Sequence, residues 1–400
     1  MRVPLNYFRC LLLGILTWAG LGPAAWAQDT KPKPRPAPPA PYQAVDARMR
    51  QVPDSSARTV GGLARFITGS FASEGDRARA AFVWVAHNIR YDVENMYMLN
   101  LQQENPDQVQ KTLDNRRGVC QQYADLFSAV ANQVGVTTYV VPGYTSLRDP
   151  LGHAWCASRI AGQWYLMDPT WAAGRVESEK FVFRFNAQHF RVAPAVFIET
   201  HMPFDPLWQL LSAPRTPLQF QQGTRPTPAS APFAFADSVA AYARQSPEQQ
   251  LRATTRRVEQ NGVKNDLTYN FLLNTRRKES DQFVTAFNNA VQAFNEGSEE
   301  FNRFITFFNR QFLPHKTDQE LRQLLVPMAT DLRRARALLA TAQPVIPAQQ
   351  ASLNEFLASL QQLETKLHDG QAFVERYQQT NKILRLMLFG NPAATGSLTR

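Results

Sequence analysis

The stretch that most strongly indicates the fold is RRGVCQQYADLF, residues 116–127. Cys120 opens a helical pattern there, and Gly135 is expected to end it. Backbone N–H groups and the helix dipole favour negative charge at a helix start, which favours the thiolate form of Cys120. Cys120 is therefore a candidate nucleophile. The apolar face of this helix comprises Tyr123, Leu126, Phe127, Val130 and Val134.

Strand patterns follow the cysteine helix. VTTYVVPGY, HAWCASRI and QWYLMD, residues 136–144, 153–160 and 163–168, are rich in β-branched and aromatic residues. Ala161 and Gly162 form the turn between the last two. A cysteine helix packed on an antiparallel sheet is an α+β fold.

The register of the last two strands brings a histidine and an aspartate together. A two-residue loop pairs Ile160 with Gln163, and the same register places His153 opposite Thr170. Asp168 is then a diagonal neighbour of His153 on one sheet face, at roughly 7–8 Å or less. A loop with an odd number of residues would break this register. Within it, an imidazole and a carboxylate can meet.

These residues suit nucleophilic catalysis. Cys120 would attack, His153 would act as base and later protonate the leaving group, and Asp168 would orient the imidazole. The backbone N–H of Cys120 could help to bind an oxyanion.

Several motifs in the same order resemble one known family. RRGVCQQYADLFSAVANQVGV followed by GHAWCASRIAGQWYLMDPTW resembles the transglutaminase-like superfamily, most strongly the bacterial branch similar to kyphoscoliosis-type peptidases. RARAAFVWVAHNIRYD, residues 77–92, and FIETHMPFDPLWQLL, residues 197–211, are similar to segments that flank the core in that branch. The resemblance covers about residues 73–220.

The resemblance implies a papain-like core and acyl transfer from a protein or peptide amide, by hydrolysis, deamidation or crosslinking. It assigns Cys120 as nucleophile, His153 as base and Asp168 as its partner, with no metal and no cofactor. Tyr91 and Gln110 are candidates for a further oxyanion donor.

Two residues depart from the family pattern. Gln122 stands where glycine is common, and we expect it to narrow the cleft. Cys156 stands where a polar residue is common, and on a regular strand it faces away from His153. We expect Cys156 to be a small buried residue, the alternative being a disulfide with Cys120.

Other histidines and tryptophans favour packing over chemistry. His87, His189 and His201 belong to no metal-ligand spacing such as H-E-x-x-H, although His201 could also line the cleft. Core positions around the site are expected for Trp155, Trp164 and Trp171.

The N-terminus has the pattern of a secretory signal. Arg2 and Arg9 precede an apolar run, and AWA precedes Gln28, so residues 1–27 are expected to be cleaved. An uncleaved anchor is the alternative, but the run is shorter than the ~20 residues a span needs. We expect a periplasmic or extracellular protein, associated with the cell surface and without a membrane span after cleavage.

Composition sets further limits. The net charge of +10 permits attraction to anionic surfaces, but no basic stripe with interleaved aromatics indicates nucleic-acid binding. We expect a Pro-rich linker at 28–50, a transglutaminase-like domain at 51–222, a second linker at 223–236 and a flexible tail at 391–400. Between these, residues 237–390 are expected to form an all-α helical bundle, with helices over about 318–341 and 348–388. Its core stripe comprises Phe283, Phe287, Phe294, Phe301, Phe304, Phe308 and Phe312.

Two functions fit the sequence. The first is an exported thiol enzyme that acts on protein or peptide amides. The second is a non-catalytic scaffold of the cell envelope that keeps the fold and binds a partner through its C-terminal helices.

Overall fold

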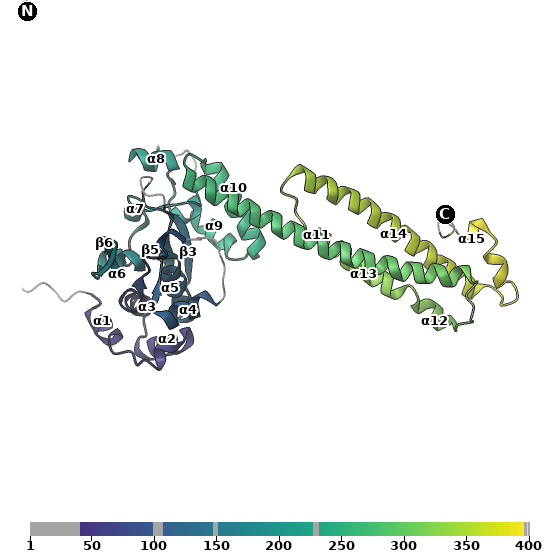
Figure 1. Ribbon diagram of the computed structural model, residues 1–400, viewed down its shortest axis with the longest axis horizontal. Coiled ribbons are helices and arrows are strands. Elements are labelled where there is room, and N and C mark those ends of the chain that lie inside the picture. The colour runs from purple at the N-terminus through teal and green to yellow at the C-terminus, as the bar shows by residue number, and fades with distance from the viewer. Residues whose placement is uncertain (1–40, 99–106, 147–150, 227–231, 396–397, 399–400) are drawn as a thin grey trace, which may run out of the picture. The chain divides into compact units, whose positions relative to one another are not determined.

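A computed structural model describes residues 41–98, 107–146, 151–226, 232–395 and 398 (Figure 1). The expected signal peptide, the proline-dense part of the first linker and parts of the second linker and the tail lie outside the described residues.

The central sheet has the strand order β5-β4-β3-β8, and each neighbouring pair is antiparallel. Its strands are β3 (Thr138–Tyr144), β4 (His153–Ile160), β5 (Gln163–Met167) and β8 (Met202–Pro203). The two-residue turn is confirmed: Ala161 and Gly162 have φ of 48° and 81°, and Ile160 pairs with Gln163.

The expected pairing of His153 with Thr170 is wrong, because strand β5 ends at Met167. Pro169 lacks the N–H that a ladder needs, and Thr170 lies in helix α6 (Pro169–Ala173). Asp168 is the N-cap of that helix and directly follows the end of β5, whereas His153 is the first residue of the neighbouring strand β4.

Helix α5 (Cys120–Gln133) begins at the cysteine, as predicted, and its expected apolar face is buried. Gly135 follows with φ of 82°, the left-handed conformation expected after a helix. Helix α3 (Glu74–Asn88) packs against α5, where Phe82 meets Phe127 edge to face.

Shorter elements surround this core. They are α2 (Val60–Ser70), α4 (Gln108–Asn115) and α7 (Pro194–Phe197), the parallel pair β1 (Arg90–Tyr91) and β2 (Arg117–Gly118), and the hairpin β6 (Gly174–Glu177) and β7 (Lys180–Phe183).

The linker expected up to residue 50 instead includes helix α1 (Gln43–Met49). Val45 and Met49 are buried, and Arg79 of α3 makes a bidentate ion pair with Asp46 at 2.8 and 2.7 Å. Burial and the ion pair stabilise this helix where composition alone indicated an extended chain.

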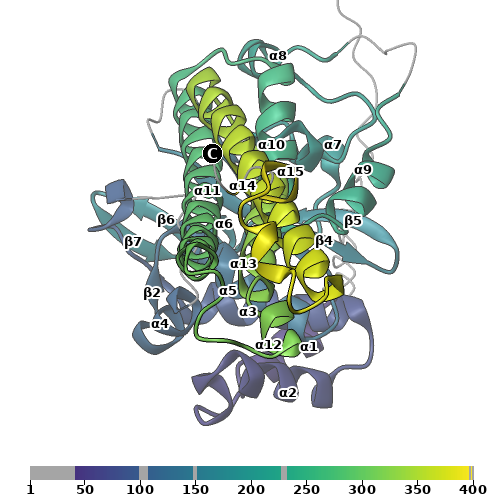
Figure 2. The same ribbon diagram turned by 90° about the vertical axis from the view of Figure 1, so that its right-hand side faces the viewer.

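The C-terminal part is helical, as predicted. It comprises α8 (Pro217–Gln222), α9 (Phe235–Tyr242), α10 (Pro247–Asn261), α11 (Asp266–Asn309), α12 (Asp318–Gln323), α13 (Val326–Thr341), α14 (Pro347–Gln379) and α15 (Pro392–Thr395). Helices α11, α13 and α14 run side by side (Figures 1 and 2), and the predicted phenylalanine stripe packs in the core between them. The last predicted helix ends earlier than expected, at Gln379, because Thr380 is extended.

The core of the helical bundle is separated from the core around the sheet within α11, and not at residue 237, where the bundle was expected to begin. Val239 of α9 packs with Trp155, and Phe271 of α11 packs with Tyr144 of the sheet. The second core begins at Phe283. No described helix combines the length and apolar character that crossing a membrane requires.

Gly143 tests the assembly of the sheet, because it pairs with His153 on one side and with Pro203 on the other. A Cβ there would lie 2.3 Å from Met202 O and 2.4 Å from a ring atom of Trp155. We expect Gly143→Ala to lower the free energy of unfolding by about 1–3 kcal/mol, measured by urea titration.

The matched control is Gly69→Ala in α2, where an added Cβ meets nothing within 4 Å. This exchange should be neutral or stabilising by up to about 1 kcal/mol. Equal effects of the two substitutions would contradict the close approach at Gly143.

Candidate active site

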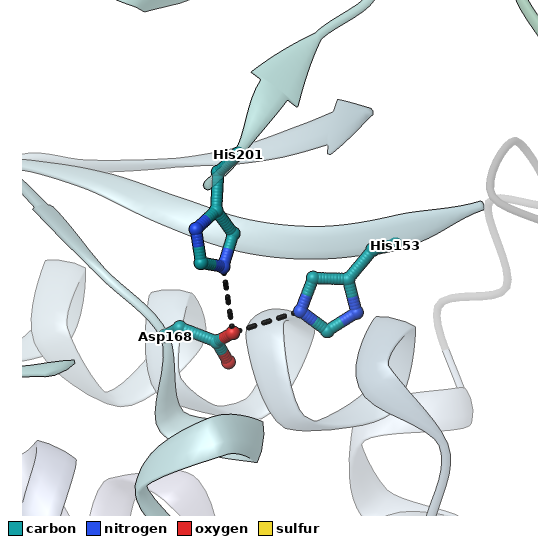
Figure 3. A group of neighbouring side chains, drawn as sticks. All are labelled: His153, Asp168 and His201. Carbon is teal, nitrogen blue, oxygen red and sulfur yellow. Dashed lines mark hydrogen bonds and ion pairs between the residues drawn. The ribbon is translucent and has the colours of Figure 1, made fainter. Parts of the chain in front are cut away.

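His153 stands at the start of β4 and meets the predicted aspartate. Its Nε2 lies 2.8 Å from Oδ2 of Asp168, and both side chains are buried (Figure 3). The predicted register continues to the pair of Cys156 with Met167, and the imidazole and carboxylate meet as expected.

Asp168 is fully buried and fully hydrogen-bonded. Its Oδ1 accepts from the backbone N–H groups of Thr170 and Trp171 at 2.8 and 3.0 Å, in the first turn of α6. A helix N-terminus favours a carboxylate in this way. The carboxylate is therefore held at one oxygen by the helix and faces the histidine with the other.

A second histidine shares that oxygen. Nε2 of His201 lies 3.2 Å from Asp168 Oδ2, and the His201 side chain is 1% exposed (Figure 3). Sequence reasoning favoured packing for this residue and missed the bond. His201 is brought in by β8, a strand of two residues that pairs with β3 beside Gly143, and so short a strand has no periodic pattern to detect.

Cys120 begins α5 and is 2% exposed, and it lies near enough to His153 to contribute to the raised pKa of that histidine. Because Nε2 of His153 is bonded to Asp168, the ring nitrogen that points away from Asp168 (Figure 3) is the one left for the thiol. The structure thus brings His153 and Asp168 into contact, and the pairing of Cys120 with His153 stays a prediction.

Electrostatics separate the two histidines. Burial disfavours a charged His153, but the Asp168 carboxylate and the Cys120 contact outweigh this and raise its pKa to about 10. Burial also opposes ionisation of Asp168, but His153 and His201 hold its pKa well below the usual range. Burial lowers the pKa of His201 to about 4, with Asp168 opposing the shift. At neutral pH the site contains a charged His153 and a neutral His201.

The two cysteines are not joined. Both are free and buried, and Sγ of Cys156 lies 3.3 Å from the carbonyl oxygen of Ala124 in α5. Burial raises the pKa of the Cys156 thiol well above its ordinary value. The prediction of a small buried residue is confirmed, and no disulfide blocks Cys120.

A cleft of about 860 Å³ opens onto His153. The hairpin β6–β7 and the residues around it supply aromatic side chains and two arginines, Arg175 and Arg184, and no carboxylate is among its described lining residues. Arg175 is paired with Glu177. The cleft lining includes Tyr91, Trp171, Phe181, Phe185 and His189.

The two candidates for the further oxyanion donor differ in their surroundings. Tyr91 lines the cleft, and its role stays a prediction. The prediction of Gln110 as a donor is wrong, because its side-chain amide already donates to Arg58 O at 2.9 Å and to Asp114 Oδ1 at 2.8 Å. The expected narrowing by Gln122 is also wrong, since its Oε1 accepts from Val119 N at 2.8 Å and caps α5.

The expected aromatic residues only partly gather at the site. Trp155 and Trp171 lie 6.0 and 5.9 Å from His153 between ring centroids, whereas Trp164 packs on Tyr139. His87 is a packed histidine, as predicted, with Nδ1 2.9 Å from Val83 O.

A metal ion would find its donors in the same cluster. Among the described residues, His153, Asp168 and His201 have ligand atoms within 4.8 Å of one another. Both Nε2 atoms already bond to Oδ2, so an ion would have to replace both hydrogen bonds.

Comparison with known proteins agrees with this site. The profile of the transglutaminase-like superfamily matches residues 57–169, which include Cys120, His153 and Asp168. The chain carries a transglutaminase-like domain. The α+β fold class predicted from the sequence is thereby confirmed.

Among curated proteins, this domain is similar to kyphoscoliosis peptidase. The mouse protein (Mus musculus) is 34% identical over 194 residues, covering 44% of this chain and 29% of the relative. Human kyphoscoliosis peptidase (Homo sapiens) is 34% identical over 157 residues, or 36% and 23% of the two chains. Hillarin from Drosophila melanogaster is 22% identical over 203 residues, or 45% and 24%. The matched region spans less than a third of each relative.

Solved structures give weaker similarities. A transglutaminase crystal structure has a TM-score of 0.24 at 19% identity, covering 37% of this chain and 36% of that chain. A putative cysteine protease from Cytophaga hutchinsonii has a TM-score of 0.22 at 22% identity, covering 33% and 39%.

The pKa of His153 predicts how stability depends on pH. A folded-state pKa of about 10, above the ordinary 6.5, means that the folded protein binds the extra proton between these values. This stabilisation is complete below about pH 6.5 and is lost as the pH rises through about 10, by up to about 1.4 kcal/mol for each pH unit.

Asp168→Asn keeps the helix cap but removes the charge that raises the pKa of His153. Urea titrations between pH 6.5 and 10 should show a smaller loss of stability with pH in this variant than in the wild type. Equal slopes would contradict the ion pair.

Proposed function

We propose that the chain is a thiol enzyme that transfers the acyl group of a protein or peptide amide. The observation that carries this proposal is the buried contact of His153 with Asp168, with Cys120 near enough to His153 to contribute to its raised pKa. Membership of the domain in the transglutaminase-like superfamily supports it.

The reaction follows from the positions of the three residues. The Cys120 thiolate attacks the amide carbonyl carbon, and the carbonyl oxygen takes the negative charge. Cys120 N–H, at the first position of α5, donates to this oxygen. His153 gives its proton to the departing nitrogen, the C–N bond breaks and an acyl-enzyme remains. Water or an amine then attacks the thioester, His153 takes its proton, the C–S bond breaks and Cys120 leaves as the thiolate.

The acceptor decides the outcome. Water as acceptor gives peptide hydrolysis or deamidation, and a primary amine gives a crosslink. The signal-like residues 1–27 support export to the periplasm or the extracellular space, where the substrates would be proteins or peptides of the cell surface.

One observation favours the second function, a non-catalytic scaffold with the C-terminal helices as the binding surface. Cys120 is only 2% exposed, so a substrate must displace part of its covering. The reactivity of the thiol separates the two functions.

The test is alkylation of the full chain with iodoacetamide near pH 6, below the range in which ordinary thiols react well. Peptide mapping distinguishes Cys120 from Cys156. Cys156 serves as an internal reference because it lies in β4, is buried against α5 and has a raised pKa. We expect fast labelling of Cys120 alone, and a loss of about tenfold or more in His153→Ala.

A second readout detects transfer itself. Casein and dansylcadaverine are incubated with the protein, and amine incorporation, ammonia release and new peptide ends are measured. Cys120→Ser should abolish whichever of these the wild type shows. A wild-type Cys120 that labels no faster than His153→Ala would refute the enzyme and favour the scaffold.

A further inference from the structure

His201 has no part in the reaction described above, yet it is buried like His153 and Asp168, which take part in it. It precedes β8, and its Nε2 lies 3.2 Å from the Asp168 oxygen that also bonds to His153 (Figure 3). Two imidazoles therefore converge on one carboxylate oxygen.

The contacts of His201 fix which ring nitrogen carries the proton. Oγ1 of Thr200 lies 2.7 Å from Nδ1, and its longer contact, 3.4 Å, is to Phe197 O. An ionised carboxylate only accepts, so the proton of a neutral His201 ring is on Nε2 and is donated to Asp168, which leaves Nδ1 to accept from the Thr200 hydroxyl. Burial keeps this imidazole neutral, so it adds a donor without adding a second positive charge.

Four donors then surround the Asp168 carboxylate. Backbone N–H groups of Thr170 and Trp171 hold Oδ1, while His201 and His153 share Oδ2. With three of these donors outside the reacting pair, rotation of the carboxylate is blocked before His153 is considered. His153 therefore meets an acceptor in a fixed orientation.

Packing alone explains His201 less well. The ring stacks on Phe197 with centroids 4.0 Å apart and lies 4.5 Å from Trp171. A phenylalanine would satisfy this aromatic surrounding without burying two ring nitrogens. Both ring nitrogens of His201 are hydrogen-bonded, as buried polar groups generally are.

We propose that His201 is a positioning residue: by donating its Nε2–H to Oδ2, it holds Asp168 so that His153 presents its other ring nitrogen to Cys120. This inference rests on the proposed function, because its effect is read at the Cys120 thiol.

The test compares two exchanges of one side chain in the full chain. His201→Phe keeps an aromatic ring among Phe197 and Trp171 but removes the donor. His201→Gln places an amide N–H near the position of Nε2 and keeps the donor. Phenylalanine suits the aromatic surrounding and glutamine keeps the donor to Asp168, so both variants are expected to fold. Circular dichroism and urea titration check this expectation.

Iodoacetamide labelling of Cys120 near pH 6 is the readout, since it needs no substrate. His201→Phe should slow labelling about tenfold or more, the size expected for losing a hydrogen bond to a charged group. His201→Gln should stay within about threefold of the wild type.

Two further variants complete the design. Thr200→Val, at an exposed position, removes the hydroxyl that fixes the tautomer and should slow labelling a few fold even if His201→Phe fails to fold. His87→Phe makes the same exchange at a half-buried histidine that contacts Phe183 and Phe185, and should leave labelling unchanged.

The outcomes separate the two claims. If Cys120 is slow in the wild type and His153→Ala has no effect, the proposed function fails and the role of His201 fails with it. If the wild type is fast and His153-dependent, but folded His201→Phe or Thr200→Val is equally fast, only the role of His201 is overturned. Equal slowing in His201→Phe and His201→Gln also overturns it, because packing and not the donor would then matter.

Discussion

A fully buried carboxylate needs a hydrogen-bond donor for each of its oxygens, and the site depends on how Asp168 meets this need. The first turn of α6 binds one oxygen and two imidazoles bind the other. The ionised carboxylate in turn keeps His153 charged, despite its burial, beside Cys120. In the proposed reaction, Asp168 would therefore act on the thiol only through His153.

The fold delivers these partners from distant parts of the sequence. The tight turn at Ala161 and Gly162 brings the β4 and β5 segments together, and Pro169 then turns Asp168 inward. His201 arrives through β8, which can approach β3 only because Gly143 has no side chain. The positions of the site residues thus depend on where these short elements begin and end: β4 begins at His153, and Asp168 caps α6.

Much of this core could be predicted because its determinants are local. The apolar spacing after Cys120 defines α5, and positive φ at the two turn residues preserves the register that pairs Ile160 with Gln163. The pairing of Thr170 failed for a local reason, because Pro169 starts a helix there. The other failures were decided by tertiary contacts, since the Gln110 amide donates to Arg58 O and α1 makes an ion pair with Arg79. His201 was missed because its role depends on a strand of two residues.

The helical half shows the same division. The phenylalanine stripe is a repeating local pattern, and the structure buries five of its residues and packs Phe287 and Phe294, which are partly buried, against that core. The place where the core ends is not a local property, since Phe271 and Phe283 lie on the same helix but in different cores. Linker composition therefore indicated a boundary that packing does not follow.

The central claim is that Asp168 holds one charged and one neutral histidine. Long-range ¹H–¹⁵N correlation spectra of the imidazoles test it most directly, recorded near pH 8, where an ordinary histidine with a pKa of about 6.5 is neutral. The account predicts that both nitrogens of His153 carry protons and that His201 is neutral with its proton on Nε2, assigned through His153→Ala and His201→Gln. A neutral His153 at that pH, or a His201 protonated on Nδ1, would contradict it.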